Sequence, residues 1–170
     1  MKLRLIDLPE MHPCLIWDDI IAAAVAVLNV QGLSAPILLT CEFNSIPSHG
    51  SSRTTLEILS SGVPAERVAK ARRTFEAHRL VELAGIAFAG LVLFHAGGHQ
   101  IRDVALRGSL ADYLVDDENR LLEIAARSQR SDFNSAWETR WSGLSERRGS
   151  GFYVCVTEFE TPATRLAFAT

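Results

Sequence analysis

Residues 64–95 form the segment that most constrains how this chain can fold. From Pro64 to His95 only two glycines weaken a helix, and the Gly97–Gly98 pair is a typical helix end. Charged pairs at i,i+4 spacing mark the first half of the segment, whereas Leu83–Phe94 is apolar on every side. A helix without a polar face must be buried. The sequence therefore predicts one long helix whose second half lies inside the core.

Length and composition predict a single cytoplasmic domain. The 170 residues are enough to bury roughly two thirds of the unfolded surface. The run Leu83–Phe94 is shorter than the roughly twenty residues that a membrane span needs, and early acidic residues do not fit a signal peptide. Three widely spaced cysteines show neither a CxxC nor a Cys/His zinc pattern, which is typical of core thiols in a reducing compartment. We expect no membrane partner.

Charge and motifs argue against several classes of function. A net charge of -3 and an isoelectric point near 5.9 argue against a broad basic surface for nucleic acid, although they leave room for a local patch. The chain has no P-loop, no dinucleotide-binding glycine pattern and no G-x-S-x-G motif. An enzyme acting on small molecules through one of these motifs is therefore not expected.

The remaining segments predict a mixed α/β (α+β) fold. Residues 1–16 read as an arm with one short strand, followed by a helix over 20–30 and a hairpin formed by 37–43 and 54–59. After the long helix, the patterns predict strands over 100–109, 110–115 and 121–128, a helix over 132–147, and strands over 151–159 and 165–168. From residue 64 onward the expected order is helix, three strands, helix, strand.

The stretch Arg107–Arg127 carries the candidate site. Turn formers at 116–119 separate two apolar-rich runs, which predicts a hairpin in which Val115 pairs with Arg120. Asp112 then falls opposite Glu123, and strand alternation places both carboxylates on one face. Two acids in an apolar row need a cation, an arginine or a shared proton. Asp112 and Glu123 are therefore the leading site candidates.

This αβββαβ order, with an acid at the start of the second strand and a glutamate in the third, resembles the PD-(D/E)XK, or restriction-endonuclease-like, superfamily. The resemblance covers residues 64–159, so that 1–63 would be an N-terminal elaboration and 160–170 a C-terminal strand or tail of one domain. It implies that Asp112 and Glu123, joined by Glu82 of the first helix, bind Mg²⁺ for phosphodiester hydrolysis. Such an ion binds a phosphoryl oxygen and lowers the pKa of a bound water.

One residue of the family motif is missing. The position of the lysine beside the attacking water is Ala125, in Glu123-Ile124-Ala125. Arg127 on the same strand face could supply positive charge, as could Arg140 on the next helix, but arginine stays protonated and is a poor base. We therefore expect a nuclease-like module that has lost catalysis and works in a DNA-associated defence or repair assembly. The alternative is an active Mg²⁺-dependent nuclease with an atypical site.

Plainer interpretations stay open for the charged residues. The acid pair would be structural if Arg107, Arg127 or Arg140 neutralised it, and Glu82 would then pair with His78 or Arg79. Glu158 and Glu160 are expected to face solvent. A phosphate-binding edge or a mixed solvated surface would account for the arginines Arg130, Arg140 and Arg147.

A second class of function is an interaction or structural subunit. The missing lysine, the acidic isoelectric point and the apolar character of the chain favour it. Its partner would be another protein or a second copy of the chain, bound along the sheet edges and the N-terminal hairpin.

Overall fold

The computed structural model describes residues 1–106, 111–145 and 151–170. Its strands are β1 (Lys2–Arg4), β2 (Ile37–Ile46), β3 (Gly50–Leu59), β4 (Ile101–Val104), β5 (Tyr113–Val115), β6 (Arg120–Arg127), β7 (Phe152–Glu158) and β8 (Ala163–Ala169). Its helices are α1 (Leu8–Met11), α2 (Asp18–Val30), α3 (Ala65–Thr74), α4 (Ala77–Gly97) and α5 (Phe133–Ser145), with 3-10 turns at Leu5–Asp7 and Arg130–Asp132.

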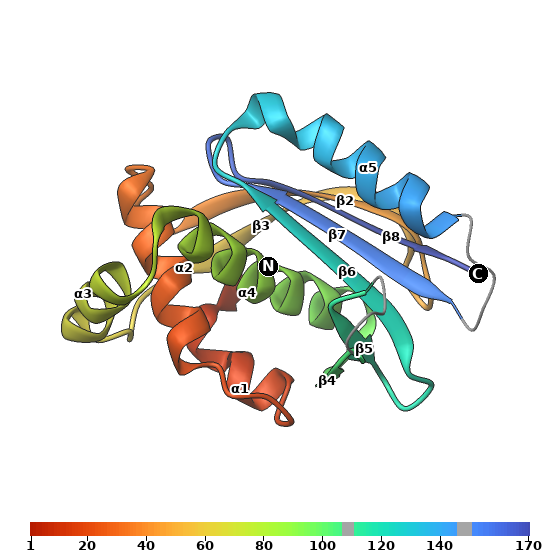
Figure 1. Ribbon diagram of the computed structural model, residues 1–170, viewed down its shortest axis with the longest axis horizontal. Coiled ribbons are helices and arrows are strands. Elements are labelled where there is room, and N and C mark those ends of the chain that lie inside the picture. The colour runs from red at the N-terminus through yellow and green to blue at the C-terminus, as the bar shows by residue number, and fades with distance from the viewer. Residues whose placement is uncertain (107–110, 146–150) are drawn as a thin grey trace.

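One mixed sheet organises these elements. The described strands form an eight-stranded sheet in the order β1-β3-β2-β8-β7-β6-β5-β4. Helix α5 lies on one face of the sheet, and α1 to α4 lie on the other (Figure 1). The expected mixed α/β class is confirmed, and so is the order of helix, three strands, helix and strand from α4 to β7. Strand β8 then returns and pairs with both β7 and β2, so the N-terminal hairpin continues the same sheet.

The long helix expected over 64–95 is two helices, so that prediction is wrong in one respect. Helix α3 ends at Thr74, and α4 begins at Ala77. Between them Phe75 and Glu76 have extended backbone, with ψ values of 141° and 157°. Neither residue is a strong helix breaker, but Phe75 packs against the main core. Tertiary packing of this partly buried side chain therefore accounts for a break that local propensity does not predict.

Helix α4 is buried, as its apolar sequence predicts. It is long and apolar enough to cross a membrane by length and composition, but 72% of its most apolar window is buried inside the fold. Gly98, in the left-handed conformation at φ 71°, ends it at the expected position. The burial identifies α4 as the central helix of the core beneath the sheet. Helix α2 packs beside it on the same face (Figure 1).

Gly85 lets α4 approach β6 closely. A Cβ atom at residue 85 would lie 2.6 Å from the Cβ of Ala126, which is closer than real side chains come. We expect Gly85→Ala to lower the free energy of unfolding by about 1–2 kcal/mol, because overpacking outweighs the gain in helix propensity. Urea unfolding would measure it. The matched control is Gly143→Ala in α5, where nothing lies within 4 Å of a new Cβ. This control should stabilise the protein by about 0.5–1 kcal/mol, and equal effects would contradict the close-approach argument.

Candidate functional site

The β5–β6 hairpin has the predicted register. Val115 pairs with Arg120 and Tyr113 with Leu122. The turn between the strands bends at Asp116 and Asn119, which have φ values of 57° and 52°. Both are residue types that tolerate this left-handed conformation. Strand β5 begins at Tyr113, later than expected, and so its pairing stops one residue short of Asp112.

Asp112 continues the hairpin through its side chain. Its backbone N–H donates to the carbonyl of Leu122 at 2.9 Å, and its Oδ2 accepts from the N–H of Ile124 at 2.8 Å. Strand N–H groups point along the sheet plane, so this carboxylate lies near the edge of β6 and does not stand directly above the sheet. Because β5 pairs with residues 120–122 alone, the second half of β6 has an edge that β5 leaves open. Asp112 covers the first part of that edge.

Glu123 lies on the face that α5 covers. Its side chain is buried, and its Oε1 accepts a hydrogen bond from Nη1 of Arg140 at 2.5 Å. Burial raises the pKa of the Glu123 carboxyl above its usual range, the nearby Asp112 charge raises it further, and Arg140 acts in the opposite direction. A carboxyl in this environment needs a proton or a cation. The guanidinium of Arg140 is that cation here.

A cavity of about 340 Å³ opens where β6 loses its partner, and we call it the arginine cavity. Its lining includes the charged residues Arg79, Glu82, Asp112, Arg127 and Arg140. The structure thus brings four of the predicted site residues together around one cavity: Glu82, Asp112, Arg127 and Arg140. Glu123 holds Arg140 in place from beside it.

The arginines of the cavity differ in how they are paired. Arg79 pairs with Glu82 at 2.9 Å, which was the plainer expectation for Glu82, and Arg140 pairs with Glu123. Arg127 donates one hydrogen bond, from Nη1 to the carbonyl of Ala126 at 2.8 Å. Among the residues that the structure describes, no carboxylate forms an ion pair with Arg127. A guanidinium has five N–H donors, so Arg127 can bind a further anion.

The carboxylates do not form a ready metal site. Asp112 bonds to the backbone, Glu123 to Arg140 and Glu82 to Arg79. Within residues 1–106, 111–145 and 151–170, no group of three or more His, Cys, Asp or Glu side chains is placed to hold a metal ion. Mg²⁺ takes oxygen ligands in near-octahedral geometry, and these side chains do not present it. The magnesium site therefore stays a prediction from the resemblance.

Arg130 lies away from the arginine cavity. It lines a separate cavity of about 280 Å³, its guanidinium lies over the ring of Phe133, and its Nη1 is 3.5 Å from the Glu158 carboxylate. The structure therefore does not group it with Arg127 and Arg140. Arg147, the third arginine predicted to bind nucleic acid, lies outside the described residues, as does Arg107.

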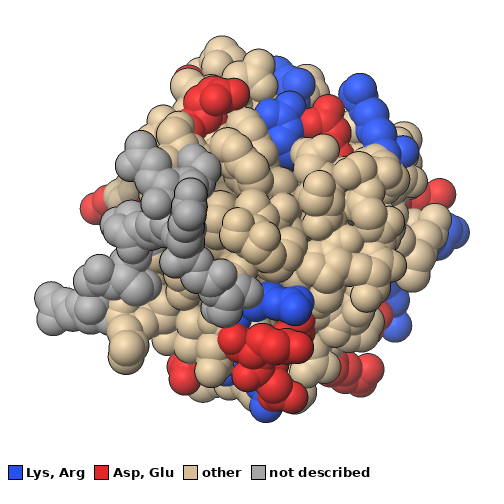
Figure 2. Space-filling model, turned by 90° about the vertical axis from the view of Figure 1, so that its right-hand side faces the viewer, with Lys and Arg blue, Asp and Glu red and all other residues tan. Residues whose placement is uncertain are grey.

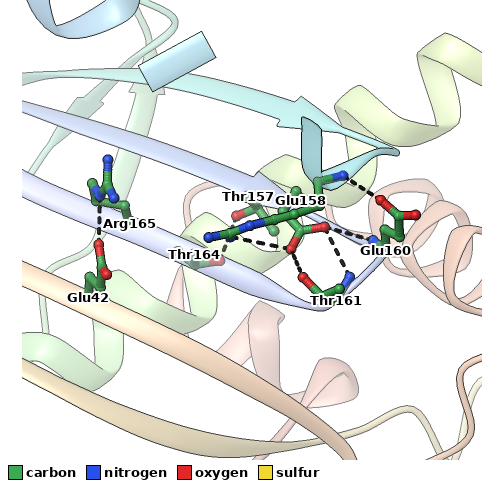
Figure 3. A network of polar contacts seen from close by, with 8 residues as sticks. Glu42, Thr157, Glu158, Glu160, Thr161, Thr164 and Arg165 are labelled. Carbon is green, nitrogen blue, oxygen red and sulfur yellow. Dashed lines mark hydrogen bonds and ion pairs between the residues drawn. The ribbon is translucent and has the colours of Figure 1, made fainter. Parts of the chain in front are cut away.

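Glu158 corrects another expectation, because it is fully buried and does not face solvent. Figure 3 shows its carboxylate turned into the β7–β8 turn, where it accepts from the backbone N–H groups of Glu160 and Thr161 and from the Thr161 hydroxyl. Thr157 and Thr164 bond to each other across the same strand pair. A turn needs acceptors for its unpaired N–H groups, and Glu158 provides them. This is a structural role.

Two histidines form hydrogen bonds between distant segments that the sequence patterns did not predict. His12 is fully buried, with Nε2 at 2.9 Å from the Gly90 carbonyl, while the Ile101 N–H donates to its Nδ1 at 3.0 Å. His99 bonds Asp116 through Nδ1 at 2.8 Å and the Pro47 carbonyl through Nε2 at 3.2 Å. Both link segments far apart in the chain, which no local motif marks. For His99, its place just after the Gly97–Gly98 helix end was the available signal.

The end of the molecule that carries the C-terminus has a mixed surface charge. Figure 2 looks at the end where the C-terminus lies, away from the carboxyl end of β6. Among the described residues visible there, acidic and basic side chains lie mainly around the rim, and no basic patch fills the middle. This agrees with the net charge of -3. This end of the molecule therefore presents no broad basic surface among its described residues.

Comparisons with known proteins add no relative to this geometry. The chain matches no protein-family profile. A search of curated proteins and a search of solved structures also gave no match. Function therefore has to be inferred from the fold and the charged cavity themselves.

Proposed function

We propose that this chain is a nuclease-like module that binds a DNA phosphate in the arginine cavity and does not cut the strand. The observation that carries the proposal is the state of Arg127. It lines a cavity at the open edge of β6, and it is the arginine of that cavity that no described carboxylate pairs. A planar guanidinium recognises a phosphate through two parallel hydrogen bonds, so Arg127 supplies the anion contact.

The neighbouring residues support binding and argue against cleavage. Arg140 and Arg79 add positive charge but are each held by a glutamate. The position that would carry the catalytic lysine is Ala125, which is buried in the apolar cluster beneath α5. Arginine does not release its proton near neutral pH, so it cannot replace lysine as a base. Phosphate recognition without strand cleavage is the function that this set of side chains supports best.

DNA binding should depend on Arg127. We expect Arg127→Met to weaken binding of a labelled oligonucleotide roughly tenfold, because a hydrogen bond to a charged group contributes about 1.5–3 kcal/mol. The slope of log affinity against log salt should also fall by about one. Fluorescence anisotropy at several salt concentrations measures both.

The matched control for charge is Arg67→Met. Arg67 lies on α3, pairs with Asp18 on the surface at 3.2 Å and lines neither the arginine cavity nor the open edge of β6. The Arg67→Met substitution removes the same charge from the protein as Arg127→Met does. The proposal fails if wild type does not bind DNA, or if Arg67→Met and Arg127→Met weaken binding equally.

A cleavage assay separates the proposed module from an active nuclease. Wild type, Asp112→Asn and Glu123→Gln are incubated with DNA and Mg²⁺ or Mn²⁺. We expect intact strands in all three reactions. Cleavage by wild type that both variants abolish would establish the active, metal-dependent alternative and overturn the proposed loss of catalysis. Absence of both binding and cleavage would favour the interaction subunit.

A further inference from the structure

A second cavity adjoins the arginine cavity. It has a volume of about 560 Å³, within the range of roughly 300–1,000 Å³ typical of ligand sites. Because Val27, Val30 and Val81 are among its apolar wall residues, we call it the valine cavity. It lies between the end of α2, the start of α4 and the carboxyl end of β6. In sheets with parallel strands, as β6 and β7 are, ligands favour the crevice beyond the carboxyl ends of the strands.

The two cavities share one wall. Glu82, Ala126 and Arg127 line both of them. A phosphate bound by Arg127 would therefore sit at the mouth of the valine cavity. The group attached to that phosphate through its sugar is a nucleobase, which has apolar faces and a polar edge.

The lining of the valine cavity matches those two properties. Aliphatic side chains from α2, α4 and β6 form part of its walls, while polar groups come from the α4 residues His78 and Glu82 and from Gln31, Ser128 and Asp132. The Gln31 amide N–H donates to the Ser128 carbonyl at 3.1 Å, so the Gln31 carbonyl oxygen is the part of the amide that can accept from a ligand. Proteins that take a base out of its stack hold it between apolar or aromatic side chains and read its edge by hydrogen bonds. The shape and chemistry of this site therefore suit one unstacked base.

We infer that the valine cavity binds a single unstacked nucleobase of the DNA strand whose phosphate contacts Arg127. This inference rests on the proposed function, because it requires that phosphate contact. It adds a substrate preference: the module should favour single-stranded or locally opened DNA over a paired duplex. Taking a base out of its stack costs more free energy in a paired duplex than in a single strand.

The test compares two short single-stranded oligonucleotides with the same number of phosphates. One is a thymidine oligomer, and the other carries an abasic sugar at every position. We expect wild type to bind the thymidine oligomer roughly tenfold more tightly, because the aliphatic walls of the cavity remove the apolar faces of one base from water. Val30→Trp should abolish this preference by filling the cavity, and it should leave the affinity for the abasic oligomer unchanged. Val30 is 64% exposed at the end of α2, so the larger side chain does not disturb the core.

Leu38→Trp is the matched control. Leu38 is 60% exposed on β2 and lines neither cavity, so this variant should keep the wild-type preference. Equal binding of the two oligomers, with dependence on Arg127 retained, would overturn the base site while the proposed function stands. No binding of either oligomer would overturn the proposed function itself. If thymidine monophosphate, at the same concentration as the oligomer, displaces it from the protein, the cavity is a site for a free nucleotide. That result would overturn the inference that the base belongs to a DNA strand.

Discussion

His12→Leu is expected to lower the free energy of unfolding by about 2–4 kcal/mol, because each buried polar group that loses its partner costs about 1–3 kcal/mol. The Ile101 N–H donates to Nδ1, so the hydrogen of the neutral ring is on Nε2 and is donated to the Gly90 carbonyl. Leucine fills the space but offers neither bond. Urea unfolding measures the loss, and His78→Leu is the control because His78 is exposed on α4. If His12→Leu lowered the free energy of unfolding no more than His78→Leu does, the two hydrogen bonds of His12 would not contribute to stability.

The His12 effect should also depend on pH. Burial lowers the pKa of His12 below its usual value of 6.5, and its Coulombic attraction to Asp116 does not outweigh burial. Below about pH 6.5 the unfolded chain therefore binds a proton that the folded protein does not, so the wild type loses stability as the pH falls. His12→Leu lacks this group. The difference in free energy of unfolding between wild type and His12→Leu should be larger at about pH 8 than at about pH 5.5. An equal difference at the two pH values would contradict a lowered pKa of His12.

Arg140→Met is expected to cost about 2–3 kcal/mol at about pH 8. Removing one partner of a fully buried ion pair lowers the free energy of unfolding by about 3–5 kcal/mol. The loss is smaller here because water screens the Arg140 side chain, which is 39% exposed. Glu123 would keep its buried carboxylate without a cation. Chemical unfolding of the variant measures the cost. The control Arg67→Met breaks an exposed pair and should cost under about 1 kcal/mol.

Protonation of Glu123 should relieve this cost. The pKa of Glu123 is already raised, and loss of Arg140 removes the influence that lowers it. The folded variant then holds a proton that the unfolded chain releases, so its stability falls as the pH rises above the ordinary carboxyl range. The penalty should shrink as the pH is lowered. In a Glu123→Gln background, Arg140→Met should cost much less at every pH, and an unchanged cost there would show that lost packing dominates.

The hairpin register could be predicted because its signals are local. The residues Asp116 to Asn119 form the turn, and the turn fixes which residues of β5 and β6 face each other. The position of the Asp112 side chain could not be predicted in the same way. It depends on where β5 begins. Because β5 begins at Tyr113, the N–H of Ile124 has no backbone partner on β5, and the Asp112 carboxylate accepts from it at the edge of β6.

The other differences have the same physical origin. The break at Phe75 and the burial of Glu158 both depend on contacts made after the chain has folded. His12 bonds residues 78 and 89 positions away in the sequence, and no motif records such a contact. Local apolar patterns, in contrast, were sufficient for two helices. The second half of α4 is apolar on every side and is buried, and the pattern of residues 132–147 predicted the helix α5, which packs on the sheet.

The position of β8 affects how this molecule can be assembled. It lies between β2 and β7, and Arg165 on β8 pairs with Glu42 on β2 across 123 residues of sequence (Figure 3). Closing so long a loop costs chain entropy before any packing compensates for it, which slows folding. Until β8 is in place, β2 and β7 both expose unpaired edges that can associate with other chains. The last strand of the chain therefore fills a place in the middle of the sheet, and the sheet cannot be complete before β8 has been synthesised. A segment that ends at residue 159 would lack β8 and would leave an edge of β7 unpaired.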